Sequence, residues 1–375
     1  MRIAVNCRFL LKDRLEGIGR YTFELTRRLC THHPEVEFVL LFDRKYEQGF
    51  IFADNVTPRV LHPQARHPIL WKAWFERAVP RALRRLTPDL FFSPDGFLSL
   101  RTKTKTLLVI HDLAFEHNPV MIPSVVRRYY KTWCPKYAER ADHIITVSQF
   151  TKADIAKRYR VPAEKISVIH NGVSEMFKPL VDSEKREVRT KYSNGEPYFL
   201  FVSALQPRKN LPRLLEAFDA FKQRTGSTMK LLVAGAHTWA KGEIMVKLRA
   251  LHSASDVRLL GHLNEQDLAQ VMAAAQALTY VSLFEGFGIP IAEAMYAETP
   301  VITSNTSSMP EVAGDAALFV DPTSVREITS ALERLASDDQ LRADLLARGR
   351  TQRQKFNWDV AAREVWEVID ALVGS

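Results

Sequence analysis

Short apolar runs alternate with longer amphipathic stretches along the whole chain. In the first half, runs rich in β-branched and aromatic residues predict buried strands at residues 2–6, 37–42, 90–92, 107–111, 143–147 and 167–170. Stretches with helical periodicity, such as residues 21–29 and 125–138, lie between several of these runs. Alternation of this kind predicts right-handed βαβ units and a parallel sheet.

The same pattern restarts after a polar, charged segment at residues 181–196. There we predict strands at residues 198–202, 231–234, 257–260, 278–281 and 301–303, and helical segments at 211–224, 265–275 and 325–348. The chain is therefore expected to be an α/β protein with two consecutive doubly wound parallel-sheet domains. We place the junction near residues 173–195.

Composition narrows the class of protein further. Of the 375 residues, 46% are hydrophobic and 25% are charged, which is typical of a packed globular protein. No apolar run approaches the roughly 18 residues that would predict a membrane span. The cysteines Cys7, Cys30 and Cys134 are odd in number and lack metal-ligand spacing, so we expect a reduced, cytoplasmic protein.

Positive charge is concentrated in the first half of the chain. The whole chain has a net charge of +9, of which residues 1–178 contribute +12 and the remainder −3. Residues 67–86 intersperse Trp71, Trp74 and Phe75 with five Lys and Arg residues. This composition suits docking on an anionic membrane surface, and equally an ordinary helix with its aromatic residues in the core. An anionic acceptor, nucleic acid or a generic solubility charge would also account for the asymmetry.

Doubly wound sheets bind ligands in the loops that follow their strands. Arg208 and Lys209 follow the predicted strand 198–202 and precede a helix that begins near Asn210. Two cations beside a helix amino terminus can hold a diphosphate, because the helix dipole and its unpaired N–H groups add to their charge. The alternative is a solvated loop.

The segment at residues 284–295 is the most informative in the sequence. It follows the apolar run 278–281, and its glycines allow a tight turn with close approach of a ligand. Glu285 falls in this loop, and Glu293 lies eight residues later, about two helical turns away. The two carboxylates can accept hydrogen bonds from the hydroxyls of a sugar and a ribose. Otherwise, Glu285 would be a helix-cap residue and Glu293 a surface charge.

Two further loops carry candidate residues. His111 and Asp112 end the apolar run 107–110, where a polar pair can bind a substrate hydroxyl or carbonyl. A structural histidine is the alternative there. Gly17 and Gly19 enter a helix, but Thr22 stands where a dinucleotide fingerprint needs its third glycine.

Together these residues resemble the retaining glycosyltransferases of family 4, which have the GT-B fold of two Rossmann-like domains facing a central cleft. The resemblance runs over nearly the whole chain and is strongest in the second half. It is carried by Pro-Arg-Lys-Asn at 207–210, Ala234-Gly235, Leu260-Gly261, the run EGFGIPIAEAM from Glu285, and SMPEVAGDA at 308–316. The similarity is closest to bacterial enzymes of surface-polysaccharide assembly, often mannosyltransferases.

The resemblance implies roles for the residues of the second domain. Glu285 would contact the donor sugar and Glu293 the ribose hydroxyls, while Lys209 and Arg208 would neutralise the diphosphate. Many relatives have an arginine after the first strand of this domain, where this chain has Ser203-Ala204-Leu205. Backbone contacts are implied for Gly286, Phe287 and Gly288 at the sugar and for Gly261, His262 and Leu263 at the nucleobase.

In the first domain the resemblance implies that His111 binds the transferred sugar near the reacting centre. Gly17 and Gly19 would line the cleft by the phosphates or the acceptor. Residues 1–175 would form the acceptor-side domain and residues 176–355 the nucleotide-sugar donor domain. A carboxyl-terminal helix at 356–375 would cross back to the first domain.

The predicted reaction is the retaining transfer of a hexose, with mannose as the expected sugar, from a nucleotide-diphosphate sugar to a saccharide or lipid-linked acceptor. No Asp-x-Asp triplet occurs in the sequence, so we expect neither a metal nor another cofactor. No carboxylate nucleophile is evident for double displacement. We therefore expect same-face attack by the acceptor, in a cytoplasmic protein that is peripheral on the inner face of the membrane.

Several other functions share some of these features. A nucleotide-sugar epimerase or a phosphorylase would have the same fold, which by itself does not separate them from a transferase. A nicotinamide-dependent oxidoreductase is disfavoured by the missing third glycine. A basic membrane- or nucleic-acid-binding module is the non-enzymatic alternative. No nucleic-acid-binding motif occurs in the sequence, so nucleic acid is not an expected partner.

Overall fold

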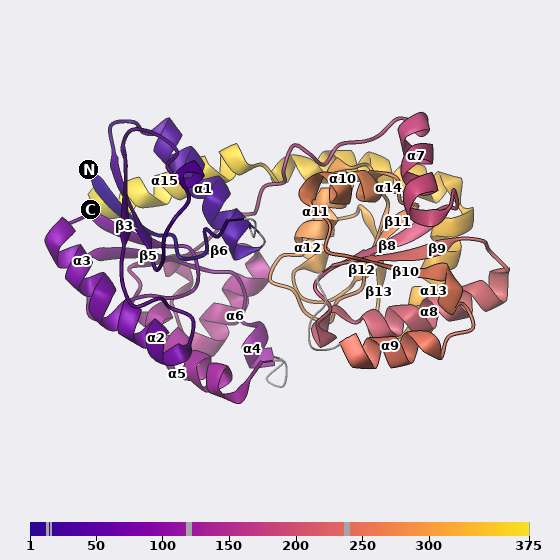
Figure 1. Cartoon of the computed structure of the whole chain (residues 1–375), viewed down its shortest axis with the longest axis horizontal. Coiled ribbons are helices and arrows are strands. Elements are labelled where there is room, and N and C mark those ends of the chain that lie inside the picture. Colours follow the sequence, from indigo (N-terminus) through magenta and orange to yellow (C-terminus); the bar gives the residue numbers. More distant parts are fainter. Residues whose placement is uncertain (13–14, 16, 118–121, 236–240, 375) are drawn as a thin grey trace. The chain divides into compact units, whose positions relative to one another are not determined.

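The computed structural model describes residues 1–12, 15, 17–117, 122–235 and 241–374. The chain divides into two compact domains (Figure 1). The N-terminal domain comprises Met1–Gly172 and Asn357–Ser375, and the C-terminal domain comprises Val173–Phe356. The chain thus leaves the first domain at Gly172, within a few residues of the predicted boundary at 175, and re-enters it at Asn357.

The N-terminal domain is built on a parallel sheet of seven strands in the order β3-β2-β1-β4-β5-β6-β7. The strands are β1 (Arg2–Asn6), β2 (Glu37–Phe42), β3 (Val56–Val60), β4 (Leu90–Ser93), β5 (Lys105–Ile110), β6 (His143–Thr146) and β7 (Ile166–Val168). The helices are α1 (Ile18–His32), α2 (Pro68–Ala73), α3 (Val79–Leu86), α4 (Ala114–His117), α5 (Ser124–Arg140), α6 (Gln149–Tyr159) and α15 (Trp358–Gly374).

The C-terminal domain repeats this plan with a parallel sheet of six strands in the order β10-β9-β8-β11-β12-β13. The strands are β8 (Tyr198–Val202), β9 (Lys230–Ala234), β10 (Val257–Gly261), β11 (Ala277–Tyr280), β12 (Val301–Ser304) and β13 (Ala317–Val320). The helices are α7 (Asp182–Ser193), α8 (Leu211–Thr225), α9 (Lys241–Arg249), α10 (Glu265–Ala273), α11 (Ile289–Tyr296), α12 (Met309–Ala313), α13 (Val325–Ser337) and α14 (Asp339–Gln352). Both strand orders are those of a doubly wound Rossmann-like sheet, which confirms the predicted fold class.

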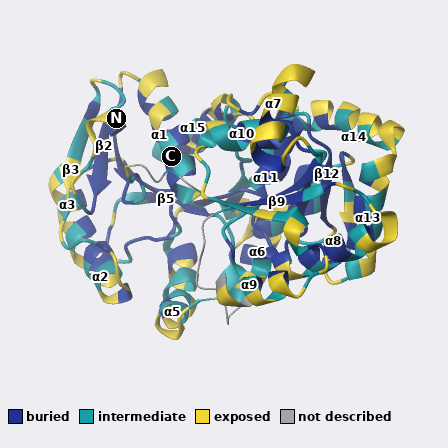
Figure 2. Cartoon of the chain, turned by 45° about the vertical axis from the view of Figure 1, so that its right-hand side comes forward, coloured by how far each residue is buried: buried dark blue, intermediate teal, exposed yellow. Residues whose placement is uncertain are grey.

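Apolar side chains fill the space between each sheet and its helices, so the strands are buried and the outer helix faces are exposed (Figure 2). In the C-terminal domain, Phe199 and Phe201 of β8 pack in one cluster with Phe218 and Phe221 of α8. Such strands are buried on both faces, because helices cover a parallel sheet on both sides. This burial explains why they are near-continuous apolar runs in the sequence.

Two strands, β3 and β13, were not predicted from the sequence, and both lie at sheet edges. Only the first residue of β3 is buried, and the strand contains Pro58. An edge strand tolerates proline because one side of its backbone has no partner. In β13, Phe319 is 39% exposed. The polar residues and Pro58 of β3 break the apolar pattern on which the prediction depended, whereas β13 is a short apolar run that the prediction overlooked.

The prediction of one helical segment over residues 325–348 was wrong. The structure has two helices there, α13 and α14, separated at Asp338. The Asp338 carboxylate accepts a hydrogen bond of 2.8 Å from the backbone N–H of Leu341. Asp338 thereby caps the amino terminus of α14, which favours a new helix over the continuation of the old one.

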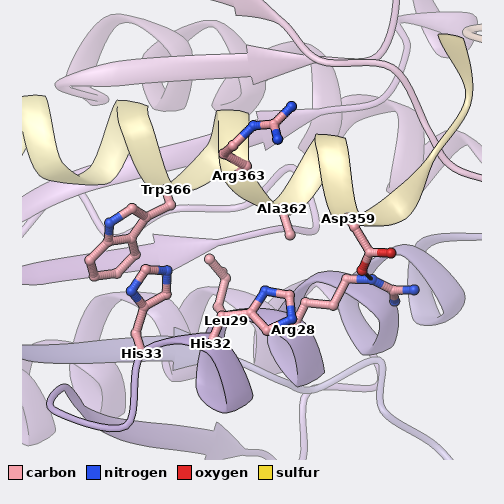
Figure 3. A pocket seen from close by; sticks show the side chains of 8 residues that line it. All are labelled: Arg28, Leu29, His32, His33, Asp359, Ala362, Arg363 and Trp366. Carbon is pink, nitrogen blue, oxygen red and sulfur yellow. Dashed lines mark hydrogen bonds and ion pairs between the residues drawn. The ribbon is translucent and has the colours of Figure 1, made fainter.

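The last helix, α15, belongs to the N-terminal domain and packs against α1 (Figure 3). Arg28 donates a hydrogen bond of 2.6 Å to Asp359, and the His33 ring stacks on Trp366 with 3.5 Å between ring centres. A hollow of about 300 Å³ lies between the two helices, and none of the predicted site residues lines it. Among the helices that the structure describes, each is too short or too polar to cross a lipid bilayer.

Candidate active site

The strand order of the C-terminal sheet reverses between β8 and β11. In a doubly wound sheet, the loops that leave two such neighbouring strands form the ligand-binding crevice. Arg208 and Lys209 lie in the loop after β8, in a single 3₁₀ turn, and Glu285 lies in the loop after β11. The topology thus brings together residues that are 76 and 77 positions apart in the sequence.

Glu285 pairs with both cations. Lys209 Nζ lies 2.6 Å from Oε1 of Glu285, and an Nη atom of Arg208 lies 2.7 Å from Oε2. Lys209 also donates to the Tyr280 hydroxyl at 3.0 Å, and Arg208 donates to the carbonyl oxygen of Phe284 at 2.9 Å. The three charged side chains form one cluster whose formal net charge is +1, which we call the Glu285 cluster.

Burial and the neighbouring charges shift the pKa of the Glu285 carboxyl in opposite directions. Burial alone would raise the pKa of the carboxyl, but the charges of Lys209 and Arg208 and the hydrogen bond from Lys209 lower this pKa to about 2. Burial also raises the pKa of the Tyr280 hydroxyl well above its usual value. At neutral pH the Glu285 cluster therefore holds an ionised carboxylate and two cations, and the Tyr280 phenol beside it is neutral.

The backbone around the Glu285 cluster is held by hydrogen bonds between loops. The backbone N–H of Leu283 donates to the carbonyl oxygen of Arg208 at 2.8 Å. The Ser308 hydroxyl, which is fully buried, lies 2.9 Å from the carbonyl oxygens of both Glu285 and Phe287. Gly288 has a φ of 97° and directly precedes α11, a conformation that favours glycine. The loop is therefore constrained before any ligand binds.

In the N-terminal domain, His111 follows β5 directly and is held in one orientation. Its Nε2 lies 2.8 Å from the carbonyl oxygen of Pro94 and therefore carries the proton, since a carbonyl oxygen only accepts. Burial lowers the pKa of the His111 ring, although the Pro94 carbonyl and the charges of Asp112 and Asp95 act in the opposite direction. The neutral ring then has an unprotonated Nδ1, which can accept a hydrogen bond from a hydroxyl.

Comparison with known proteins shows the family to which the chain belongs. Residues 15–175 match the model described as Glycosyltransferase Family 4, and residues 182–352 match that of Glycosyl transferases group 1. The O-antigen chain mannosyltransferase B of Escherichia coli is 30% identical over 366 residues, which is 93% of this chain and 94% of that protein. The chain belongs to the family 4 glycosyltransferases. The predicted family is confirmed.

Solved structures show the same fold over the full length of this glycosyltransferase. Sucrose-phosphate synthase from Thermosynechococcus elongatus has a TM-score of 0.80 at 18% identity, covering 100% of this chain and 99% of that one. The Anabaena protein HepE, in a complex with UDP-glucose, has a TM-score of 0.78 at 16% identity, covering 99% and 100%. At these identities the likeness shows the fold alone.

Apart from Gly17 and Gly19, the other predicted donor-binding residues of the glycosyltransferase lie in the C-terminal domain. Glu293 is partly exposed in α11, the helix that leaves the loop of Glu285. Gly286, Phe287 and Gly288 complete that loop. Gly261 ends β10 with a φ of 71°, and its carbonyl oxygen accepts from the N–H of Gly235 at 2.7 Å. His262 and Leu263 follow it in the loop to α10.

Gly17 and Gly19 lie at the start of α1 in the N-terminal domain. Gly17 is its N-cap residue, with a φ of 50°, and Gly19 is buried in its first turn. Tyr21 on the same helix meets the His111 ring edge-on, with 4.7 Å between ring centres. The structure thus brings the amino-terminal end of α1 to His111.

Sequence reasoning missed several side chains that shape these loops. Tyr280 ends β11 as an apolar strand residue, and nothing local distinguishes it from a core tyrosine. Ser308 lies in the run SMPEVAGDA, but only the fold shows that it binds the loop of Glu285. Arg8 and Asp95, a buried ion pair in the N-terminal domain, were also overlooked. A charged residue two positions after an apolar strand is the signal that would have found both Arg8 and Asp95.

A hollow of about 480 Å³ adjoins the loop of Arg208 and Lys209. It is lined by residues on either side of the two cations: Gln206, Pro207, Asn210, Pro212, Arg213, Glu216 and Ile244. Asn210, with a φ of 63°, donates to the carbonyl oxygens of Val281 and Pro322. Among the described residues, no group of three or more His, Cys, Asp or Glu side chains could hold a metal ion.

Proposed function

We propose that this glycosyltransferase moves mannose from a guanosine-diphosphate donor to a mannose-containing acceptor, free or lipid-linked, with retention of configuration. The meeting of Arg208, Lys209 and Glu285 at the reversal point of the C-terminal sheet carries this proposal. Mannose is chosen because the relative with 93% coverage of this chain is named as a mannosyltransferase. The C-terminal domain would bind the donor and the N-terminal domain the acceptor.

Lys209 and Arg208 would stabilise the diphosphate as it leaves. Their hydrogen bonds to Glu285 fix both side chains before the reaction, so little reorganisation remains when negative charge develops. Glu285 would also accept hydrogen bonds from donor-sugar hydroxyls, and Glu293 would bind the ribose. The reaction needs no divalent ion in this scheme, because the two cations supply the charge that a metal would supply.

In the proposed reaction, the bond between the sugar C1 and the phosphate oxygen breaks, and a bond from C1 to an acceptor hydroxyl oxygen forms on the same face. The proton of that hydroxyl passes to the leaving phosphate oxygen. His111 would accept a hydrogen bond from a sugar hydroxyl at its unprotonated Nδ1. Trapping a covalent glycosyl-enzyme on any side chain would contradict this route.

A thermal-shift screen tests the donor. Among the common nucleotide sugars at equal concentration, GDP-mannose is expected to raise Tm most, since a ligand at 100 times its Kd stabilises a protein by about 2.7 kcal/mol. A transfer assay with octyl α-mannoside, read by NMR, should then give an α-linked product. A larger shift with another nucleotide sugar would contradict the choice of donor, and epimerised donor or a phosphate-dependent reaction would contradict transfer itself.

We further propose that the N-terminal domain docks on an anionic membrane surface and that the protein is cytoplasmic. Between residues 66 and 86 the exposed basic side chains are Arg66, Lys72, Arg77, Arg81, Arg84 and Arg85. Glu76, the one acidic residue of this stretch, is buried and bonded to the N–H of Leu100. Each basic residue near an anionic leaflet contributes about 1 kcal/mol of attraction.

The same surface carries exposed apolar side chains. Ile69 of α2 is 73% exposed and Val125 of α5 is 56% exposed. The two helices are joined through the stacking of Trp71 on Tyr130 and through Lys72, whose Nζ lies 4.9 Å from the centre of the Trp133 ring. The aromatic residues therefore pack largely inside the domain, and the cations with Ile69 and Val125 would face the lipid.

Cosedimentation with phosphatidylglycerol vesicles tests this docking. The double substitution Arg84→Glu/Arg85→Glu on α3 is expected to weaken binding about tenfold or more, and 0.5 M salt should weaken wild-type binding as well. The matched control is Arg326→Glu/Arg334→Glu, which makes the same charge change on exposed residues of α13. Equal losses in both variants would mean that only net charge matters and would contradict a docking face.

A further inference from the structure

The N-terminal sheet has a buried ion pair at its own reversal point. The strand order reverses between β1 and β4, and Arg8 and Asp95 each lie two residues beyond the end of one of these strands. Arg8 Nε donates to Asp95 Oδ2, and the two side chains are only 4% and 1% exposed. A buried ion pair stabilises a fold less than apolar packing of the same volume does, so stability alone is a weak reason for it.

The guanidinium group of Arg8 is only partly used within the protein. Nε is satisfied by Asp95, but within the described ranges neither Nη atom has a hydrogen-bond partner. The buried side-chain atoms that have no hydrogen-bond partner do not include the two Nη atoms of Arg8. Both Nη atoms are therefore accessible to solvent. A charged group held inside the protein, with donors directed at its surface, is set to hydrogen-bond a ligand.

The surroundings of Arg8 indicate the chemistry of that ligand. The guanidinium carbon lies 4.1 Å from the centre of the Phe97 ring, 4.8 Å from Phe9 and 6.0 Å from Trp71. Phe9 and Trp71 are partly exposed. Asp95 cancels the charge of Arg8, so the spot is neutral overall. Donors beside aromatic rings, without net charge, suit the hydroxyls and C–H faces of a saccharide better than a phosphate.

Arg8 also lies close to the proposed reacting centre within this domain. Pro94, whose carbonyl oxygen accepts a hydrogen bond of 2.8 Å from Nε2 of His111, directly precedes Asp95. The side-chain amide of Asn6 at the end of β1 donates to the hydroxyl of Ser93 at the end of β4, at 3.0 Å. The ends of β1, β4 and β5 thus form one edge that carries His111 and the Arg8–Asp95 pair together.

We propose that Arg8 binds the acceptor: its Nη groups donate hydrogen bonds to hydroxyl oxygens of the acceptor saccharide, while Asp95 holds the guanidinium in place. The aromatic rings of Phe9 and Trp71 would pack against the sugar. This inference rests on the proposed glycosyl transfer and adds to it the residue that recognises the second substrate.

The substitution Arg8→Lys tests the role of Arg8. Lysine keeps a cation for Asp95 but loses the planar fork of donors, so the KM for octyl α-mannoside should rise about tenfold or more. The Tm shift with GDP-mannose, and the slow hydrolysis of GDP-mannose without acceptor, should stay within about twofold of wild type. The matched control is Arg28→Lys. Arg28 lies near the carboxyl-terminal end of α1 and pairs with Asp359 of α15, so this substitution should change none of these values.

A second variant separates binding from structure. In Arg8→Gln/Asp95→Asn, a neutral hydrogen-bonded pair replaces the buried charges, so the domain should fold even if Arg8→Lys does not. Its acceptor KM should still rise, whereas a purely structural pair predicts a wild-type KM. An unchanged acceptor KM in a folded variant, or an equal loss of donor binding, overturns the role of Arg8. A wild-type protein that transfers no sugar from any nucleotide sugar overturns the proposed function as well.

Discussion

Replacing Lys209 with alanine is expected to lower the rate of sugar transfer by about 10²–10³-fold, which is the usual effect of removing one preorganised donor from a developing negative charge. In the structure, Lys209 is buried, with its Nζ 2.6 Å from Glu285 and 3.0 Å from the Tyr280 hydroxyl. Its position is therefore set before the donor arrives. Without Lys209, the Glu285 cluster has a formal net charge of zero and attracts a diphosphate far less.

The loss should occur mainly in kcat, because the charge on the phosphate grows as the C1–O bond breaks. Steady-state kinetics with GDP-mannose measure it. The matched control is Lys222→Ala, which removes a partly buried lysine of the same domain, one that pairs with Asp256 at 2.8 Å. Near-normal turnover in Lys209→Ala, or an equal loss in Lys222→Ala, would show that Lys209 does not act on the leaving group.

Replacing Glu285 with glutamine is expected to destabilise the folded protein by about 3–5 kcal/mol at pH 7, since it leaves two buried or partly buried cations without their carboxylate. Arg208 and Lys209 have side-chain exposures of 19% and 11%, so water compensates little. Urea unfolding gives the free energy. The control is Glu298→Gln, whose carboxylate pairs with Arg350 and Arg353 nearer the surface and should contribute about 1 kcal/mol or less.

The contribution of Glu285 to the stability of the folded protein should also depend on pH in a defined direction. Lys209 and Arg208 lower the pKa of its carboxyl from 4.5 to about 2 against the opposing effect of burial. A lowered pKa means that the ion pairs stabilise the fold above about pH 4.5, and that this stability is lost as the pH falls toward 2. The loss amounts to roughly 3 kcal/mol.

Urea unfolding of the wild type and of Glu285→Gln, measured at several pH values between 7 and 2, provides the test. The difference in unfolding free energy between wild type and Glu285→Gln should be largest above pH 5 and should shrink as the pH falls toward 2. A difference that stays constant from pH 7 to pH 3 would show that Glu285 is not ionised under these conditions, and a difference below about 1 kcal/mol at pH 7 would contradict the buried pairing.

The interior strands were predictable from sequence, whereas two of the four edge strands, β3 and β13, were not predicted. The strands β1, β2 and β8 have the predicted bounds, because helices cover both faces of each strand and their interior positions are apolar. β3 and β13 lie at sheet edges, where Pro58 and the exposed Phe319 are tolerated. The edge strands β7 and β10 were predicted, so a position at the sheet edge does not by itself hide a strand.

The candidate site was predictable as a set of loops but not as a set of contacts. Parallel strands all end at one edge of a sheet, so loops that follow apolar runs could be singled out from sequence, and Arg208, Lys209 and Glu285 lie in such loops. Their mutual pairing depends on the adjacency of β8 and β11. The roles of these residues in binding and transfer stay predictions.

By itself, the sequence determined that the chain forms two doubly wound domains, that it belongs to this family of glycosyltransferases, and that charged residues follow particular strands. These properties depend on short-range periodicity and on local motifs. Only the tertiary structure decided that Glu285 is shared between two cations and that Arg8 is buried against Asp95. Those pairs join residues 76 to 87 positions apart, and strand order, set by packing of the whole domain, brings them together.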